Sequence, residues 1–419
     1  MKILAVHNRY REIGGEDFVV RSEADILSSA GHIVMRYERD NREIEKPAFS
    51  GAASLALQTI WSRKSYREVS RIARGKKPDV AHFHNTLPLI SPSAHWACKR
   101  NAVPVVQTLH NYRLLCPAAT FLRAGKVCER CLGKAIPWPG VVHACYRDSR
   151  AASAAVASML SIHRLLHTWT AAVDVFIALS EFAKTKFVAG GLPAEKIHVK
   201  PNFVYPDPGS GADPSDCALF VGRLSPEKGP ATLLAASGLL GGRVPLRIIG
   251  DGPLRAQLQS QAGREGLSTI SFEGALPREK VFDAMKRSRF LVVSSECYEN
   301  FPMAIVEAFA CGVPAIVPGL GACAEIVADG GTGLRFNAGD AADLAAKIEW
   351  AWTHPLQMRE MGLAARAEFE AKYTAPRNLR LLLEIYERAI SGDLPGLPAA
   401  NVSAPNLSLM TRPCVTPYV

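Results

Sequence analysis

Short apolar runs alternate along most of the chain with longer stretches in which apolar and polar residues are mixed. In the N-terminal half this pattern predicts strands at residues 2–7, 32–38, 79–85, 103–110 and 173–180. In the C-terminal half it predicts strands at 218–223, 245–252, 269–274, 289–295 and 314–319, with helices that begin near prolines 230, 253, 277 and 302. Repeated strand–helix units predict an α/β protein with two doubly wound parallel sheets.

The chain of 419 residues is long enough for two domains. The segment "PNFVYPDPGSGADPSD" is rich in Pro, Gly, Asp and Ser, and is the strongest linker candidate. We expect an N-terminal domain over 1–205 and a C-terminal domain over 216–375. A helix over 376–390 would pack back toward the N-terminal domain, and a disordered tail would follow over 391–419. Because doubly wound sheets bind ligands beyond the carboxyl ends of their strands, the cleft between the domains is the expected site.

Composition and charge indicate whether the chain is a globular, a secreted or a membrane protein. With 21% charged and 48% apolar residues, the chain reads as an ordinary globular protein. The apolar N-terminal run is too short for a signal peptide, and "AASAAVASMLSI" is shorter than the roughly 20 residues that span a membrane, so a cytoplasmic location is expected. The net charge of +10 is concentrated in residues 1–200, which hold 29 Lys and Arg against 16 Asp and Glu.

The densest basic segment is "WSRKSYREVSRIARGKK", in which Arg63, Arg67, Arg71 and Arg74 fall on one face of a helix. Two interpretations stay open: a solvated helix face, or contact with anionic lipid headgroups that would make the protein peripheral on the inner face of a membrane. Nucleic-acid binding is disfavoured because no recognised module accompanies the cluster.

Candidate chemistry begins with "ENFPMAIVEAFACG", residues 299–312. Asn300 as N-cap, Pro302 in the first turn and Gly312 as the stop predict a buried helix of about ten residues. The N-terminus of this helix could bind a phosphate. Glu307 could accept hydrogen bonds from two ribose hydroxyls, and Glu299 could bind the hydroxyls of a sugar. A glycoside hydrolase also needs two acids, but eight helical steps would separate them by about 12 Å. A capping acid beside an exposed acid, without function, is the structural alternative.

Two further loops favour phosphate binding. In "VGRLSPEKG", Arg223 and Lys228 follow a strand and could neutralise a departing diphosphate. Gly250, in "GDGP", follows the next strand and would let the backbone approach a ligand closely. No G-x-G-x-x-G follows the first strand, which argues against a nicotinamide-dependent dehydrogenase.

Together these motifs resemble the retaining glycosyltransferases of family 4, which have the GT-B fold of two Rossmann-like domains facing a cleft. The paired glutamates and the "AFACGVPAIVPGLGACAEIV" after them match the family pattern, as do "KPDVAHFHN", "QTLH", "FIALSEF", "KPNFV", "GRLSPEKG" and "IIGDGP", over essentially residues 1–390. Here Asn300 and Pro302 stand where the family commonly has glycines.

The resemblance implies roles for individual residues. Arg223 and Lys228 would bind the donor diphosphate, Glu307 the nucleotide ribose and Glu299 the donor sugar. The loop contacts implied with them are Gly250, Asn300, Phe301, Pro302 and Met303. His110 would reach the transferred sugar from the N-terminal domain, and Gly14 and Gly15 would border the donor phosphates or the acceptor. The catalytic group is then His110, Glu299, Arg223 and Lys228, whereas His82 and His84 are expected to be structural or supporting residues.

The implied activity is that of a hexosyltransferase without a catalytic metal. It would move a sugar from a UDP- or GDP-sugar to a lipid-linked or polysaccharide acceptor in cell-envelope or exopolysaccharide synthesis. A GT-B sugar-nucleotide epimerase or phosphorylase is the alternative, and a catalytically silent binding protein a further one.

Four of the ten cysteines crowd into an insert over residues 113–148. Cys116, Cys128, Cys131 and Cys145 include a Cys-x-x-Cys knuckle, the composition of a four-thiolate structural zinc site. An iron–sulfur cluster and four reduced thiols are the alternatives, and His143 is a substitute ligand. In a cytosolic chain metal binding is favoured over disulfides.

We therefore predict that the purified protein carries zinc close to one ion per chain, measured by elemental analysis after removal of loosely bound metal. Less than about 0.2 zinc per chain in a folded preparation would contradict a structural site, because such sites bind as the chain folds.

Overall fold

The structure, a computed structural model, describes residues 1–11, 14–44, 49–211 and 217–392. The chain forms two compact units, each considered separately below. The first comprises Met1–Phe121, Cys128–Pro201 and the segment that begins at Pro376, and the second comprises Leu122–Val127 and Asn202–Ala375. Part of the expected linker, 212–216, and the expected tail from residue 393 lie outside the described residues. Within the described residues, no helix combines the length and the apolar character that crossing a membrane requires.

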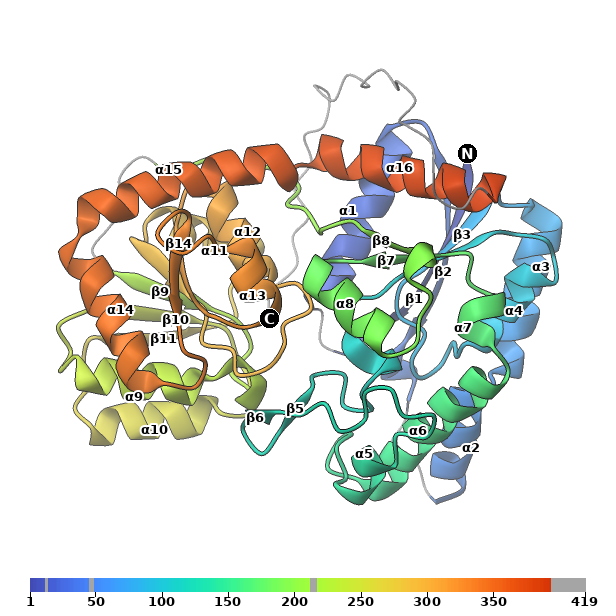
Figure 1. The fold of residues 1–419 in the computed structure, drawn as a ribbon, viewed down its shortest axis with the longest axis horizontal. Helices are drawn as coiled ribbons and strands as arrows, with labels where there is room; N and C mark the ends of the chain where they lie inside the picture. Colours follow the sequence, from blue (N-terminus) through green and yellow to red (C-terminus); the bar gives the residue numbers. More distant parts are fainter. Residues whose placement is uncertain (12–13, 45–48, 212–216, 393–419) are drawn as a thin grey trace. The chain divides into compact units, whose positions relative to one another are not determined.

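The first unit is built on a six-stranded parallel sheet with the strand order β2-β1-β3-β4-β7-β8 (Figure 1). Its strands are β1 (Lys2–Arg9), β2 (Ile33–Asp40), β3 (Val80–Phe83), β4 (Val105–Thr108), β7 (Val175–Ala178) and β8 (Ile197–Val199). Its main helices are α1 (Gly15–Ser29), α2 (Phe49–Ile60), α3 (Arg63–Lys76), α4 (Ser93–Lys99), α6 (Arg150–Leu165), α8 (Glu181–Ala189) and α16 (Ala375–Ser391). The cysteine-rich insert contributes a short helix to this unit, α5 (Trp138–Val142), whereas its two short strands, β5 (Leu122–Arg123) and β6 (Lys126–Val127), belong to the segment Leu122–Val127 of the second unit.

The second unit is built on another six-stranded parallel sheet, with the order β11-β10-β9-β12-β13-β14. Its strands are β9 (Ala218–Val221), β10 (Leu246–Ile249), β11 (Ile270–Gly274), β12 (Phe290–Val292), β13 (Ala315–Pro318) and β14 (Gly333–Phe336). Its helices are α9 (Pro230–Leu239), α10 (Arg255–Arg264), α11 (Arg278–Lys286), α12 (Met303–Ala310), α13 (Gly321–Ile326), α14 (Ala341–Thr353) and α15 (Pro355–Lys372).

The core of the second unit lies on both faces of its sheet, as strand β9 shows. Ala218 and Phe220 belong to one buried cluster, together with residues of α9, α10 and α14. Leu219 and Val221 belong to another, together with residues of α11, α12 and α15. Successive side chains of a strand point to opposite faces, so a continuously apolar strand is buried on both sides.

The predicted α/β architecture of two doubly wound parallel sheets is confirmed. The sequence pattern had missed one edge strand in each sheet, β8 and β14. Both are short and carry partly exposed residues, so neither produces the apolar run by which the other strands were recognised.

Candidate functional site

The loop after strand β9 lies at the centre of the candidate site in the second unit. Strand β9 has β10 on one side and β12 on the other, which places the end of β9 at the topological switch point where such sheets bind ligands. The N–H of Leu224 donates to the Asp251 carbonyl (2.8 Å) in the loop after β10. On the other side, the Ser294 hydroxyl donates to the Lys228 carbonyl (2.9 Å) in the loop after β12. Three loops are thus bonded into one continuous edge.

Gly250 has a structural explanation in this edge. Its φ of +138° is unfavourable for residues with side chains, and a Cβ atom there would lie 1.9 Å from the Gly222 carbonyl oxygen. The packing of the two loops therefore demands a glycine at this position, whether or not a phosphate also approaches it.

Lys228 and Glu299 form the main polar contact of the site. Lys228 Nζ lies 2.6 Å from Glu299 Oε1, and the Ser295 hydroxyl donates to the same oxygen at 2.6 Å. Burial would raise the pKa of Glu299, but the charge and hydrogen bonds of Lys228 and Ser295 hold it below its ordinary value. Burial would likewise lower the pKa of Lys228, and the neighbouring carboxylate reverses that effect and raises it. Both side chains are therefore ionised at neutral pH.

The second glutamate has a different cation. Glu307 is buried on α12, and its Oε1 lies 3.4 Å from Nη2 of Arg278, whose Nη1 donates to the Tyr205 carbonyl (2.7 Å). Sequence reasoning missed Arg278, because one basic residue at the start of a helix gives no sign of its partner. Since each acid has its own cation, the two do not form a pair of carboxylates that share a proton. Arg223 is exposed in the loop after β9, near the start of the segment that carries Lys228.

The expected start of the acidic helix was wrong. Helix α12 runs from Met303 to Ala310, with Pro302 rather than Asn300 as its N-cap and no side-chain capping hydrogen bond. Phe301 precedes a proline, and that position disfavours helical backbone, so the helix cannot begin earlier. The stop is as expected: Gly312 follows the last turn with a φ of +75°. Asn300 is buried, whereas Phe301 and Met303 are partly buried against the core below the loop.

Gly14 and Gly15 lie at the start of α1 in the first unit, with Gly14 as its N-cap. The N–H of Gly14 donates to the Asp17 carboxylate (2.9 Å). Gly14 has a φ of −118°, which any residue adopts, and an added Cβ would meet no atom of the described residues within 4 Å. The protein's own packing therefore does not explain this glycine. Close by, burial raises the pKa of Glu16 to about 7, although His7 acts in the opposite direction.

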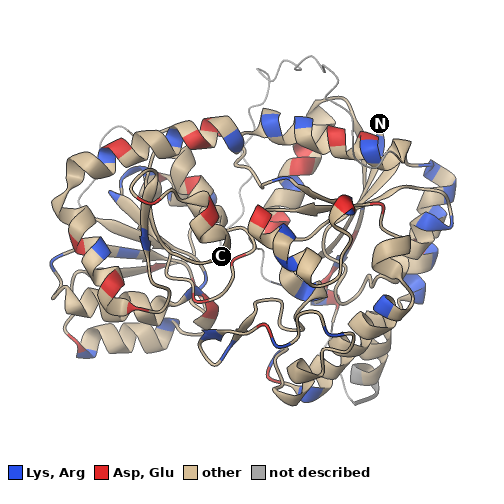
Figure 2. Cartoon of the chain, in the orientation of Figure 1, with Lys and Arg blue, Asp and Glu red and all other residues tan. Residues whose placement is uncertain are grey.

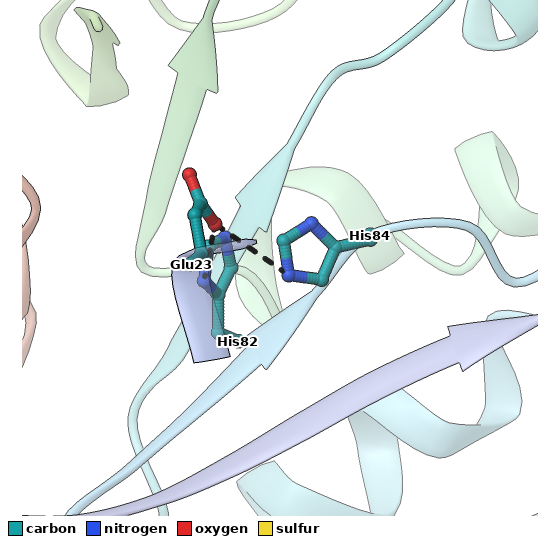
Figure 3. Close-up of side chains that lie close together, drawn as sticks. All are labelled: Glu23, His82 and His84. Carbon is teal, nitrogen blue, oxygen red and sulfur yellow. Dashed lines mark ion pairs between the residues drawn. The ribbon is translucent and has the colours of Figure 1, made fainter. Parts of the chain in front are cut away.

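His110 follows strand β4 and contacts His84, which follows β3. The planes of the two rings are inclined by 27°, and His84 Nδ1 lies 2.9 Å from His110 Nε2. His84 and His82 lie beside one another, and each has a ring nitrogen 3.9 Å from Oε2 of the buried Glu23 carboxylate (Figure 3). Burial lowers the pKa of His84 and His110 well below the ordinary value, so both imidazoles are neutral at pH 7.

Glu23, His82 and His84 also form the one group of three metal-ligating side chains that the described residues bring within 4.8 Å of one another. The ammonium of Lys200 lies 2.7 Å from Glu23 Oε1 in the same interior. It already supplies the positive charge that this carboxylate needs, and it would repel a divalent cation. The cluster is therefore better described as a buried ion pair with neutral histidines.

The four cysteines of the insert lie near one another without forming such a group. Burial, together with the neighbouring thiols of Cys116, Cys145 and Cys128, raises the pKa of Cys131 to about 11. Gly133, two residues after the knuckle, has a φ of +71° and so turns the chain sharply back. The four thiols of the insert are thus neighbours. No three of their sulfur atoms lie within 4.8 Å of one another, as the ligand atoms of Glu23, His82 and His84 do.

Comparison with solved structures first identifies the fold. The structure of HepE from Anabaena, in complex with UDP and glucose, superposes with a TM-score of 0.66 and 18% sequence identity, over 92% of this chain and 99% of that one. Such a likeness at low identity establishes the GT-B fold of glycosyltransferases.

Sequence comparison then identifies the two halves. A family model described as Glycosyltransferase Family 4 matches residues 19–207, and one described as Glycosyl transferases group 1 matches residues 210–368. Both halves of the chain therefore match glycosyltransferase domains, the first that of Glycosyltransferase Family 4 and the second that of Glycosyl transferases group 1, which makes the protein a transferase. The D-rhamnosyltransferase WbpZ of Pseudomonas aeruginosa is 33% identical over 159 residues, 38% of this chain and 41% of that protein. The amylovoran biosynthesis glycosyltransferase AmsK of Erwinia amylovora is 27% identical over 229 residues, 51% and 56% respectively. The chain thus matches about half the length of these curated relatives.

The Lys228–Glu299 pair yields a prediction for Lys228→Ala. Turnover should fall by about 10²–10³-fold, because a cation aimed at a developing charge contributes that much to catalysis. The free energy of unfolding should fall by only about 1–3 kcal/mol, the cost of leaving one buried polar group unpaired. The pKa of Glu299 should rise, since burial then acts without the compensating ammonium, and carboxyl NMR during a pH titration would measure it.

Lys280→Ala is the matched control, because Lys280 lies in the same unit with its side chain 69% exposed in a surface ion pair with Asp283. That variant should change neither turnover nor stability appreciably. Near-normal turnover of Lys228→Ala would contradict the assignment of this site.

Proposed function

We propose that the protein transfers a sugar from a nucleoside diphosphate donor to an acceptor hydroxyl with retention of the anomeric configuration. The observation that carries the proposal is the ionised Lys228–Glu299 pair at the switch point of the second sheet. A diphosphate needs cations, and a sugar needs hydrogen-bond acceptors, and this pair offers one of each at adjacent positions. The two family matches support the same conclusion.

In this proposal Arg223 and Lys228 bind the diphosphate and stabilise its charge as it leaves the anomeric carbon. The unpaired N–H groups at the start of α12 add partial positive charge. Glu299 accepts hydrogen bonds from the donor sugar, and Glu307, held by Arg278, is assigned to the ribose. The acceptor hydroxyl then attacks from the face that the diphosphate leaves. No catalytic metal is invoked, because the cationic side chains perform the charge stabilisation.

His110 is assigned to the transferred sugar, and Gly14 and Gly15 to the phosphates or the acceptor. The depressed pKa of His110 makes it neutral at pH 7, so it takes part as a hydrogen-bonding group and not as a charge. The open space beside Gly14 supports the close approach of a ligand to the backbone there. Both assignments give the first domain a part in the proposed reaction.

For the donor we propose a UDP- or GDP-sugar, and for the acceptor a lipid-linked or polysaccharide chain in cell-envelope or exopolysaccharide synthesis. Two comparisons support this choice, because HepE forms a complex with UDP and glucose and the name of AmsK refers to amylovoran biosynthesis. An epimerase or a phosphorylase of the same fold would instead convert the donor alone, or cleave it with phosphate.

A screen of UDP- and GDP-sugars tests the proposal directly. We expect one class of donor to bind by calorimetry and to release its nucleoside diphosphate faster when a saccharide or polyprenyl-phosphate acceptor is added. NMR of the product should show the anomeric configuration of the donor. Inversion of that configuration, or donor conversion that needs no acceptor, would overturn the assignment.

We also retain a structural zinc site in the insert as a proposal. Its support is the Cys128–Cys131 knuckle followed by the turn at Gly133, with Cys116 and Cys145 close enough to influence the Cys131 thiol. In this proposal the four sulfur atoms move closer together around the ion. A segment with such short strands and little regular structure gains most from such a crosslink.

Membrane contact is the third part of the proposal, and it rests on helix α3. Arg63, Arg67, Arg71 and Arg74 are all exposed, and no ion pair between described residues involves any of them. Basic residues recur along α3 (Figure 2). Trp61, just before the helix, is 37% exposed, and Leu57 on the preceding α2 is 68% exposed. Uncompensated cations beside exposed apolar groups suit the surface of an anionic bilayer.

Vesicle sedimentation tests this contact. The protein should bind phosphatidylglycerol vesicles, with an affinity that falls as salt screens the charges. Arg67→Glu/Arg71→Glu should weaken binding by about tenfold or more. The matched control is Arg377→Glu/Arg380→Glu, which makes the same charge change at exposed positions of α16. Equal loss in both variants, or binding that is insensitive to salt, would contradict a specific α3 surface.

A further inference from the structure

A row of buried polar side chains in the first unit leads from helix α1 to His110. Lys200 and Glu23 form an ion pair at 2.7 Å, with side chains 0% and 3% exposed. The other carboxylate oxygen, Glu23 Oε2, has no hydrogen-bond partner among the described residues and lies 3.9 Å from His84 Nε2 (Figure 3). The opposite nitrogen of the His84 ring, Nδ1, lies 2.9 Å from His110 Nε2. Carboxylate, first imidazole and second imidazole are thus in series.

The two imidazoles are neutral, so each carries a single proton on one of its two nitrogens. In the contact between them, one nitrogen must donate and the other must accept. The distance of 2.9 Å is compatible with either arrangement. The choice between them therefore depends on what faces the remaining nitrogen of His84.

Glu23 makes that choice. A proton on His84 Nδ1 would leave the Nε2 lone pair facing a carboxylate oxygen, an unfavourable contact in an interior with little dielectric screening. A proton on Nε2 instead directs an N–H dipole at the carboxylate. His84 Nδ1 is then the acceptor, and His110 must hold its proton on Nε2 to donate to it. The Nδ1 atom of His110 is left unprotonated.

We propose that Glu23, acting through His84, fixes His110 in its Nε2–H tautomer and so presents Nδ1 as an acceptor for a hydroxyl of the transferred sugar. Glu23 and His84 are then positioning residues. The contact with the sugar rests on the proposed function, whereas the choice of tautomer does not. Within the described residues no hydrogen bond occupies His110 Nδ1, as this role requires.

Lys200 makes the arrangement stable. A lone carboxylate buried at this depth would tend to take up a proton, and a protonated Glu23 could no longer favour one tautomer. Glu23 is not such a lone carboxylate, because the Lys200 ammonium donates to its Oε1 at 2.7 Å within a buried ion pair. His82 lies beside this row, but its nitrogens are engaged by the Tyr386 hydroxyl (2.8 Å) and the Thr108 hydroxyl (2.7 Å). It does not contact His110 by any hydrogen bond between described residues.

The test is NMR of the full-length protein with ¹⁵N-labelled histidine, in which protonated and unprotonated ring nitrogens have widely separated shifts. His110→Gln identifies the resonances by their loss. In the wild-type protein we expect His110 with Nε2 protonated and Nδ1 unprotonated. The Nδ1–H tautomer would overturn the proposal, and this measurement requires no folded variant of the ion pair.

The second arm compares Glu23→Gln/Lys200→Met with Tyr386→Phe. Both charges are removed together because replacing a whole buried ion pair is often tolerated, whereas removing one partner leaves an unpaired charge in the interior. A glutamine can face His84 with its oxygen or its nitrogen, so His110 should then populate both tautomers. Tyr386→Phe removes a hydroxyl from the same cluster and should leave His110 unchanged. A single Nε2–H tautomer in the double variant would show that Glu23 does not set it.

Turnover separates this proposal from the proposed function. With UDP-glucose as the probe, UDP release by the double variant should fall about tenfold in kcat, with KM within twofold of wild type. If the tautomer shifts as expected and kcat does not change, the contact between His110 and the sugar is overturned while the control of the tautomer stands. If wild-type His110 is the Nδ1–H tautomer and the enzyme still releases UDP from UDP-glucose, the proposed control of the tautomer by Glu23 is overturned and the transferase assignment stands.

Discussion

Parallel strands impose one constraint on which the rest of this molecule depends: their carboxyl ends all emerge at the same edge of the sheet. The central strands of each sheet are buried on both faces, so most polar side chains of the two candidate sites lie at or just beyond the strand ends. The strand order places β9 between β10 and β12 and places β1 between β2 and β3. Loops distant in sequence are thereby brought together at two switch points, which is where the polar clusters lie.

Charge compensation is the second theme, and it recurs in both units. Glu299 has Lys228, Glu307 has Arg278, and Glu23 has Lys200. Each acid is largely removed from water, where an isolated charge would be costly, and each is matched by one cation at short range. The first of these pairs is partly open to solvent, with Lys228 32% exposed, whereas the Glu23–Lys200 pair is closed. The Lys228–Glu299 pair can therefore exchange its mutual contact for contacts with a ligand, whereas the Glu23–Lys200 pair can only hold its neighbours in place.

The histidines show how a buried charge acts beyond its own contacts. Burial alone makes His84 and His110 neutral, but it does not determine where their protons lie. A carboxylate on α1 makes that choice for a residue at the end of β4, through one intermediate ring. Such a residue contributes to a site without touching its ligand, as supporting carboxylates do for histidines in other enzymes.

Local apolar patterns and motifs at strand ends were enough to predict the two parallel sheets, most of their strands and the loops that carry Arg223, Lys228 and Glu299. The predicted start of α12 at Asn300 is wrong, because Pro302 blocks an earlier start and is the N-cap instead of a residue of the first turn. The partners Arg278, Ser295 and Lys200 were decided only by the tertiary structure. Each lies far along the chain from its acid or on a separate turn of the backbone, and a contact between separate elements leaves no periodic signal in either one. The same holds for His84 and His110, which neighbouring strands bring together across 26 residues of sequence.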